Sequence, residues 1–220
     1  MTRVSGMPGR DCPRCPRLAA FRDSWRVQEP AWFNAPVDSF GPSDARLLIV
    51  GLAPGLRGAN RTGRPFTGDY AGELLYTTLA EFGFARGDYR ASADDGLELV
   101  DCRITNAVRC VPPENKPTPK EIATCRDFLA ATLTEMGKLR AVLALGRVAH
   151  ESFVAACGLQ RSKYPFAHGC AHPIAAITLF DSYHCSRYNT NTGVLTTQMF
   201  RDVIAQARKA IDAKSDGQDL

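Results

Sequence analysis

Short apolar runs that alternate with segments of helical periodicity restrict the fold of this chain more than any other feature. Four runs have the length of a strand, at 46–50, 102–108, 141–145 and 175–179. The spacing of apolar residues predicts helices between and after them, over 71–82, from 119 onward, up to 157 and over about 197–213. Because the strands are apolar on both faces, the alternation predicts an α/β fold with a parallel sheet covered on both sides.

Length and composition favour a single unit. The chain has 220 residues, and we expect one domain over 1–220, with an N-terminal arm at 1–45 and a disordered tail at 212–220. No apolar run approaches the roughly 18 residues of a membrane span, and the first ten residues contain no apolar signal segment. These features predict a cytoplasmic protein, and the lack of a surplus apolar stripe predicts a monomer.

Three unusual polar segments follow predicted strands, at 51–68, 106–110 and 184–193. In parallel sheets ligands bind at the carboxyl ends of the strands, so we expect these segments to form a site. The first is eighteen residues long, with five glycines and the arginines 57, 61 and 64. It matches neither a dinucleotide fingerprint nor a phosphate-binding loop of the Walker type. Its arginines would suit contacts with phosphates, although a solvated surface explains the charge equally well.

The chain has eight cysteines, which is many for a protein without a secretory signal. Such a protein is expected in a reducing compartment, where disulfides do not usually form. Cys12 and Cys15 form a C-x2-C pair that could hold a metal, and Cys110 and Cys125 could complete the site. Four thiolates suit zinc or an iron–sulfur cluster, and the spacing does not choose between them. Cys125 also fits an apolar helix face. Cys102 and Cys157 are assigned to the core, while Cys170 and Cys185 remain unassigned.

His184 differs from the other histidines in its surroundings. It lies just after a predicted strand, in a polar loop that continues through Arg187 to Gly193. Such a loop carries groups that can reach phosphates and bases. His150, His168 and His172 have no comparable setting and are interpreted as structural.

Taken together, these segments resemble the uracil-DNA glycosylase superfamily, and most closely its iron–sulfur-containing family 5. The matching text is GLAPGLRGANRTGRPFTGD at 51–69, ITNAVRCVPPENKPTPKEIATC at 104–125 and SYHCSRYNTNTGVLT at 183–197. The resemblance implies a three-layer α/β/α sandwich around a four-stranded parallel sheet. It also implies a 4Fe–4S cluster of structural role, bound by Cys12, Cys15, Cys110 and Cys125, with the arm 1–45 supplying the first two ligands.

The resemblance further assigns roles at the site. Phe66 would stack on a base flipped out of DNA, Asn106 would read its Watson–Crick edge, and His184 would donate a hydrogen bond to uracil O2 as negative charge develops there. Asp69 would direct the attacking water, because Leu52 replaces the polar residue of related families. Further substrate contacts are expected from Gly51, Ala53 and Gly55, and contacts with DNA phosphates from Arg57, Arg61 and Arg187.

The resulting hypothesis is a monofunctional DNA glycosylase that removes uracil, and other deaminated or damaged bases, at the start of base excision repair. It is monofunctional because no lysine stands among the expected pocket residues to form a Schiff base. Leu52, and Cys185 where the family has proline, leave a second hypothesis open: a non-catalytic iron–sulfur protein that binds damaged or single-stranded nucleic acid. A zinc protein is the third.

Overall fold

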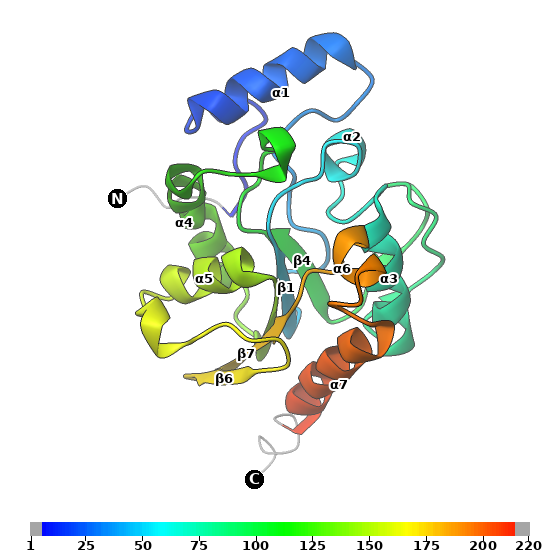
Figure 1. Cartoon of the computed structure of the whole chain (residues 1–220), viewed down its shortest axis with the longest axis vertical. Coiled ribbons are helices and arrows are strands. Elements are labelled where there is room, and N and C mark those ends of the chain that lie inside the picture. Colours follow the sequence, from blue (N-terminus) through cyan, green and yellow to red (C-terminus); the bar gives the residue numbers. More distant parts are fainter. Residues whose placement is uncertain (1–5, 214–220) are drawn as a thin grey trace.

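A central sheet of five strands organises the computed structural model, which describes residues 6–213 (Figure 1). The strand order is β4-β1-β5-β7-β6. Four of the strands are parallel, namely β4 (Cys102–Asn106), β1 (Leu47–Gly51), β5 (Ala141–Leu145) and β7 (Ile177–Ser182). The fifth, β6 (Ala171–Ile174), pairs antiparallel with β7 at the edge.

Helices cover both faces of the sheet, because successive side chains of each strand point to opposite sides. Leu47 and Ile49 pack in one core with α3 (Tyr70–Glu81) and α7 (Thr197–Ala213). Leu48 and Val50 pack in a second core with α4 (Pro119–Glu135) and α5 (Arg147–Ala156). The two helical layers lie on either side of the sheet in Figure 1, which confirms the three-layer α/β/α sandwich.

Local sequence signals locate most elements to within a few residues. The four predicted strands are the four parallel ones, and α4 begins at the capping box in which Thr118 and Glu121 satisfy each other's backbone amides. The expectation of four strands omits β6, whose His172 and Pro173 are not typical of a strand interior. Also unforeseen are α1 (Pro16–Gln28), α2 (Ala59–Thr62), α6 (Arg187–Asn191) and the small sheet of β2 (Ala85–Arg86) and β3 (Glu98–Leu99).

The carboxyl ends of the strands bring the three polar segments to one edge. Gly51 and Asn106 are partners at the ends of β1 and β4, and His184 lies two residues beyond the end of β7. The tail expected at 212–220 lies outside the described residues from 214 onward. None of the helices within 6–213 is long and apolar enough to cross a membrane.

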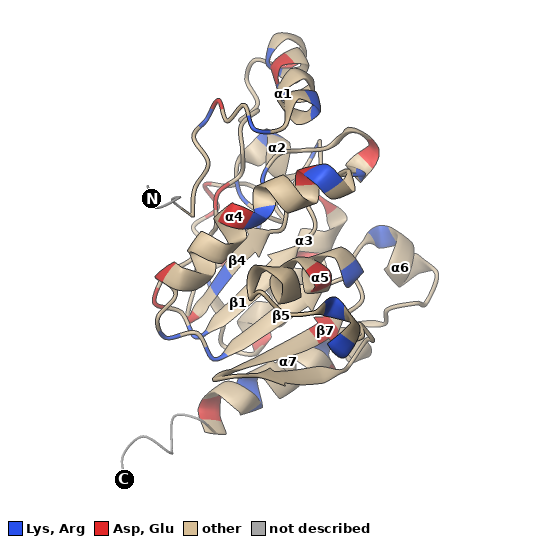
Figure 2. Ribbon diagram, turned by 90° about the vertical axis from the view of Figure 1, so that its left-hand side faces the viewer, with Lys and Arg blue, Asp and Glu red and all other residues tan. Residues whose placement is uncertain are grey.

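Acidic partners neutralise much of the basic N-terminal segment, where both signs of charge occur on α1 (Figure 2). Arg14 pairs with Asp127 and Arg17 with Glu121. The interpretation of Arg64 as part of a surface cluster is wrong. Its side chain is buried and forms two hydrogen bonds of 2.7 Å with Asp95, so it supports the fold and cannot reach a phosphate.

Candidate active site

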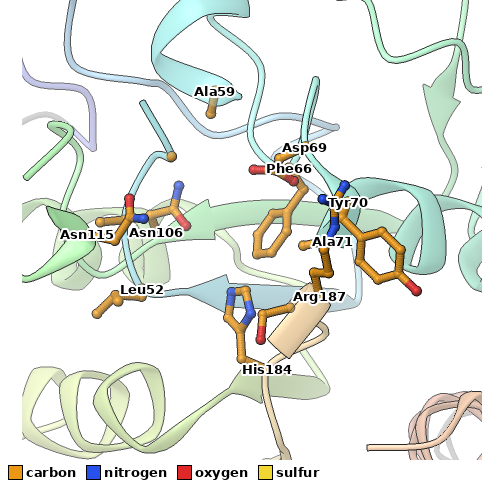
Figure 3. Close-up of a pocket in the computed structure, with 13 residues that line it drawn as sticks. Leu52, Ala59, Phe66, Asp69, Tyr70, Ala71, Asn106, Asn115, His184 and Arg187 are labelled. Carbon is orange, nitrogen blue, oxygen red and sulfur yellow. The ribbon is translucent and has the colours of Figure 1, made fainter. Parts of the chain in front are cut away.

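A cavity of about 510 Å³ opens at the carboxyl edge of the sheet. It is lined by several residues that the sequence points to, among them Ala53, Gly55, Phe66, Asp69, Asn106, His184 and Arg187. They come from the segments after β1, β4 and β7, which are distant in the chain. Figure 3 shows Asn106, Phe66 and His184 arranged around a common space. The volume is typical of a site for a small organic ligand.

Asn106 presents an unsatisfied amide at the end of β4. The residue is only 2% exposed, and no described residue donates a hydrogen bond to its Oδ1. A buried acceptor without a partner is unfavourable, so it indicates a ligand that supplies the missing donor. Gly51 makes room for this amide, because a Cβ at Gly51 would lie 2.4 Å from Asn106 Oδ1 and 2.6 Å from Phe66 Cζ.

Phe66 forms an aromatic wall that the backbone holds in an unusual conformation. Its φ of 51° lies in the left-handed region, which bulky residues adopt only where the surroundings impose it. The hydroxyl of Tyr89 donates to the Phe66 carbonyl and accepts from the Gly68 amide, both at 3.2 Å. Tyr76 donates to the carbonyl of Pro65 at 2.6 Å. The ring therefore has a fixed position in the cavity.

His184 faces Phe66 from the opposite side, with ring centroids 5.8 Å apart and planes inclined by 26°. Burial lowers the pKa of His184 to about 4, so the imidazole is neutral at physiological pH. No residue among 6–213 hydrogen-bonds to its ring nitrogens, while Asn189 donates to its backbone carbonyl at 2.8 Å. One ring nitrogen can thus donate to a ligand.

Cys185, the residue after His184, is buried, and its thiol donates a hydrogen bond of 3.5 Å to the carbonyl of Ala71. Ala71 belongs to the first turn of α3. Cys185 therefore connects the His184 loop to α3.

The two carboxylate oxygens of Asp69 have different surroundings. Oδ1 accepts from the Gly72 amide at 3.3 Å and caps α3. Oδ2 faces the Gly-rich loop, where a Cβ at Gly58 would lie only 2.5 Å from it. The residue is exposed at the cavity, yet desolvation of its carboxylate raises its pKa, against the opposing hydrogen bonds of α3. Oδ2 is therefore free to accept a proton or orient a water. Leu52 lines the same cavity and offers only apolar contacts.

Not every expected residue reaches the cavity. Gly51 lies behind its lining, and Arg57 and Arg61 lie outside it, with Arg61 donating to the carbonyl of Arg57 at 2.9 Å. Arg187 does line the cavity, where its guanidinium lies 5.4 Å from the centre of the Tyr70 ring. Within residues 6–213, no carboxylate lies within ion-pairing distance of these three arginines.

Four cavity residues were not anticipated: the apolar Ala59 and Ala71 and the polar Asn115 and Ser186. Asn115 belongs to the short 3-10 turn Pro113–Asn115 and has a φ of 56°. The Pro-rich segment 111–119 signals a loop here, but nothing in it signals that the loop bends back to the cavity. Ser186 lies within the expected polar segment 184–193 and caps α6 by accepting from the Asn189 amide.

The four cysteines with possible ligand spacing lie together, away from the cavity. Cys12, Cys15, Cys110 and Cys125 pack around Leu18, Val108 and Phe128. Burial raises the pKa of Cys110 to about 12 and that of Cys125 to about 11. The backbone amide of Arg109 donates to Cys125 Sγ at 3.3 Å. One buried thiol, that of Cys125, and three partly buried ones on the same apolar cluster are a donor set that a thiophilic metal centre fits.

Fold and cavity together define an α/β protein with a cavity at the carboxyl edge of its sheet, lined by an aromatic ring, a buried amide and a neutral imidazole. The chain belongs to the uracil-DNA glycosylase superfamily, whose family model matches residues 38–208. It is 44% identical over 205 residues to the type-5 uracil-DNA glycosylase of Thermus thermophilus, covering 90% of this chain and 93% of that protein.

Other relatives give the same grouping. A type-5 uracil-DNA glycosylase of Pyrobaculum aerophilum is 38% identical over 201 residues, covering 90% of this chain and 88% of that protein. A type-4 uracil-DNA glycosylase of Thermotoga maritima is 39% identical over only 115 residues, or 52% of each chain. The similarity to type-5 enzymes thus extends over nearly the whole chain, in agreement with the family indicated by the sequence.

Proposed function

We propose that this protein hydrolyses the N-glycosidic bond of uracil in DNA and so begins base excision repair. Water adds its hydroxyl to C1′ of the sugar, and the base leaves with the bonding electron pair and takes up a proton. The products are free uracil and an abasic site. The unsatisfied amide of Asn106, between an aromatic ring and a neutral imidazole, is the observation that carries this proposal.

Asn106 supplies recognition. Its Oδ1 accepts from uracil N3–H, while its amide nitrogen donates to uracil O4. Cytosine has an acceptor at N3 and a donor at N4, so with the amide in the orientation of this structure it leaves the buried oxygen of Asn106 unsatisfied. A site built around such a buried polar group rejects the wrong partner strongly. Phe66 stacks on the flipped ring, which offsets part of the unstacking cost.

His184 and Asp69 act on opposite sides of the breaking bond. The neutral imidazole donates to uracil O2, where negative charge accumulates as the base departs. Because protonated His184 is disfavoured by its burial, it acts as a fixed hydrogen-bond donor across the neutral pH range. Asp69 Oδ2 orients the water toward C1′ and accepts its proton, and desolvation makes this carboxylate a better base.

DNA is the partner that the exposed cations suit. Arg57, Arg61 and Arg187 contact the phosphates around the flipped nucleotide, and the protein acts as a monomer. The cavity of about 510 Å³ exceeds what one pyrimidine needs, which supports removal of other deaminated or damaged bases as well. Among residues 6–213, no lysine lines the cavity, which supports a monofunctional reaction without a Schiff base.

Cys12, Cys15, Cys110 and Cys125 hold a 4Fe–4S cluster, two ligands coming from the arm 1–45. The four cysteines lie on one apolar cluster with Leu18, Val108 and Phe128, a setting that suits thiolate ligands of an iron–sulfur cluster. Bound there, the cluster supplies a covalent link between arm and body, while the catalytic groups belong to the cavity. Stoichiometric zinc in a colourless preparation would contradict this assignment.

Base excision from a labelled duplex with one uracil tests the proposal, with alkaline cleavage to reveal abasic sites. We expect a cleaved product from uracil and none from the cytosine duplex, and a much slower reaction with Asn106→Ala. Protein that carries its metal centre and binds the duplex without releasing any base, uracil or other damaged bases included, would instead be a non-catalytic binder of damaged or single-stranded nucleic acid.

A further inference from the structure

A buried group of titratable side chains lies behind the His184 loop and has no part in the chemistry above. It consists of His150 on α5, His172 on β6 and Asp181 on β7. His150 and Asp181 are almost completely buried, at 1% and 0% exposure. Buried ionisable groups need partners, and here they partner one another.

The hydrogen bonds fix the protons of this group. His150 Nε2 lies 2.7 Å from the carbonyl oxygen of Tyr164, and because a carbonyl only accepts, Nε2 carries a proton. His150 Nδ1 lies 2.6 Å from Asp181 Oδ1. Asp181 Oδ2 accepts from the Ala167 amide at 3.3 Å and contacts His172 Nε2 at 3.0 Å. Because Nε2 already carries a proton, the short contact between His150 Nδ1 and Asp181 Oδ1 requires one further proton, which the imidazole and the carboxyl group share.

Two imidazoles and a carboxylate are also the ligand types of a transition-metal site, and their ligand atoms lie within 4.8 Å of one another. The separations decide against a metal. Ligands bonded at about 2.1 Å in a tetrahedral site lie about 3.3 Å apart, whereas His150 and Asp181 approach to 2.6 Å. Such a contact requires a proton between the two atoms.

The group also fixes the backbone that leads to His184. Asp181 exchanges backbone hydrogen bonds with Gly169 and Cys170, at 2.8 and 3.0 Å. The Ser182 carbonyl accepts from the Gly146 amide at 2.8 Å, and the Tyr183 amide donates to His168 Nδ1 at 3.1 Å. Hydrogen bonds on both sides of Asp181 thus hold the end of β7 against residues 168–170.

His184 depends on this support. Its ring makes no hydrogen bond to residues 6–213, so its direction follows from its backbone and from the stacking against Phe66. We propose that Asp181 and His150 are positioning residues, a buried proton-sharing pair that fixes the end of β7 so that His184 points at the leaving base. This inference rests on the proposed function.

Asp181→Asn keeps the shape of the side chain and removes its charge. Because misplacement of a catalytic group by about 1 Å can cost 10²-fold in rate, we expect a 10- to 100-fold lower single-turnover excision rate. The dissociation constant for uracil DNA should change less than about twofold, since Asp181 does not line the cavity. Asp44→Asn, at an exposed pair with Lys138, is the matched control and should keep the wild-type rate.

The same substitution in a His184→Ala background separates positioning from general damage. If Asp181 acts through His184, Asp181→Asn lowers the rate of that variant no further. An equal loss in both backgrounds, or a loss of DNA affinity alone, overturns the proposal. If Asp181→Asn does not fold, His172→Gln replaces it, because His172 is partly exposed and contributes one contact of the group.

Histidine NMR on the full protein gives a readout that does not require activity. We expect His150 with both ring nitrogens protonated near neutral pH, and His184 ring signals that shift in Asp181→Asn but not in Asp44→Asn. Unmoved His184 signals, a singly protonated His150 or stoichiometric zinc lost in His172→Gln would each overturn the inference. If the wild-type protein excises no base, the proposed function is wrong. The NMR spectra still test whether Asp181 and His150 form the positioning pair.

Discussion

Two walls of the cavity face one another, and each is held from behind by a buried ion pair. The Phe66 wall, residues 64–69, is anchored where Arg64 meets Asp95 in two hydrogen bonds of 2.7 Å. The His184 wall, residues 181–187, is anchored where His150 meets Asp181 at 2.6 Å. In both walls the ion pair lies outside the cavity. It influences the substrate-facing side chain only by holding the backbone in place.

The difference between the two anchors is their response to pH. An arginine stays charged throughout the range in which proteins fold, and its hydrogen bond to Asp95 holds the pKa of that carboxyl far below its usual range. Burial disfavours the charge on His150, yet the hydrogen bond and charge of Asp181 raise its pKa overall. The Phe66 wall therefore has a permanent anchor, and the His184 wall one that depends on a proton.

Removing the reactive group from each wall has the largest expected effect. Loss of one donor aimed at a developing charge typically costs 10²–10³-fold in rate, so we expect His184→Ala and Asp69→Ala each to slow uracil excision by about that factor or more. Affinity for uracil DNA should persist, because Phe66 and Asn106 remain. Single-turnover kinetics measure the excision rate, and DNA titration measures the affinity. Near-normal rates in both variants would show that His184 and Asp69 do not have the proposed catalytic roles.

Breaking the permanent anchor should mainly affect stability. Asp95→Asn leaves the buried guanidinium of Arg64 without its anion, and breaking a buried pair in this way costs about 3–5 kcal/mol. Urea unfolding measures the change. The matched control is Asp127→Asn, at an exposed pair with Arg14, which should change the free energy of unfolding by no more than about 1 kcal/mol. Equal effects would mean that the anchor is no stronger than a surface pair.

The comparison of the two walls also shows which parts of the site could be predicted from the sequence. Phe66, Asn106 and His184 belong to sequence segments that begin at or shortly after the ends of strands. The capping box of Thr118 and Glu121 locates its helix from four consecutive positions. Such signals need no knowledge of the tertiary structure. They place the groups that face the cavity.

The anchors carry no local signal. Asp95 lies 31 residues from Arg64, and Asp181 lies 31 residues from His150. Only the fold brings them together, so charge counting assigned Arg64 to the surface and left His150 as an ordinary structural histidine. Asn115 was missed for the same reason, since its loop reaches the cavity through two successive left-handed residues, Glu114 and Asn115.

Opposite pH responses of the two anchors follow from their pKa shifts. The pKa of His150 is raised on folding, so its contribution is complete below the unfolded value of about 6.5 and is lost as pH rises through the folded value. The pKa of Asp95 is lowered, so its contribution is complete above the unfolded value of about 3.9 and is lost on acidification.

Urea unfolding from pH 2 to 9 tests this difference. Wild type should lose stability above about pH 6.5 relative to His150→Gln, whose side chain does not titrate, while Asp95→Asn should lose its disadvantage as pH falls below about 3.9. Parallel curves for wild type and His150→Gln over the alkaline range would show that His150 does not change its charge there, and the contrast between the walls would disappear.

The smallest effect comes from one hydroxyl group of the Phe66 wall. Tyr89→Phe removes the bridge between the Phe66 carbonyl and the Gly68 amide and keeps the ring. Tyr89 is half-buried, so water can replace part of this bridge, and we expect about 1 kcal/mol of lost stability and less than a tenfold lower excision rate. Tyr188→Phe, on a side chain that is 74% exposed, is the stability control. A rate loss as large as that of Asp181→Asn would mean that the Phe66 wall is as sensitive to its support as the His184 wall, although its ion pair is intact.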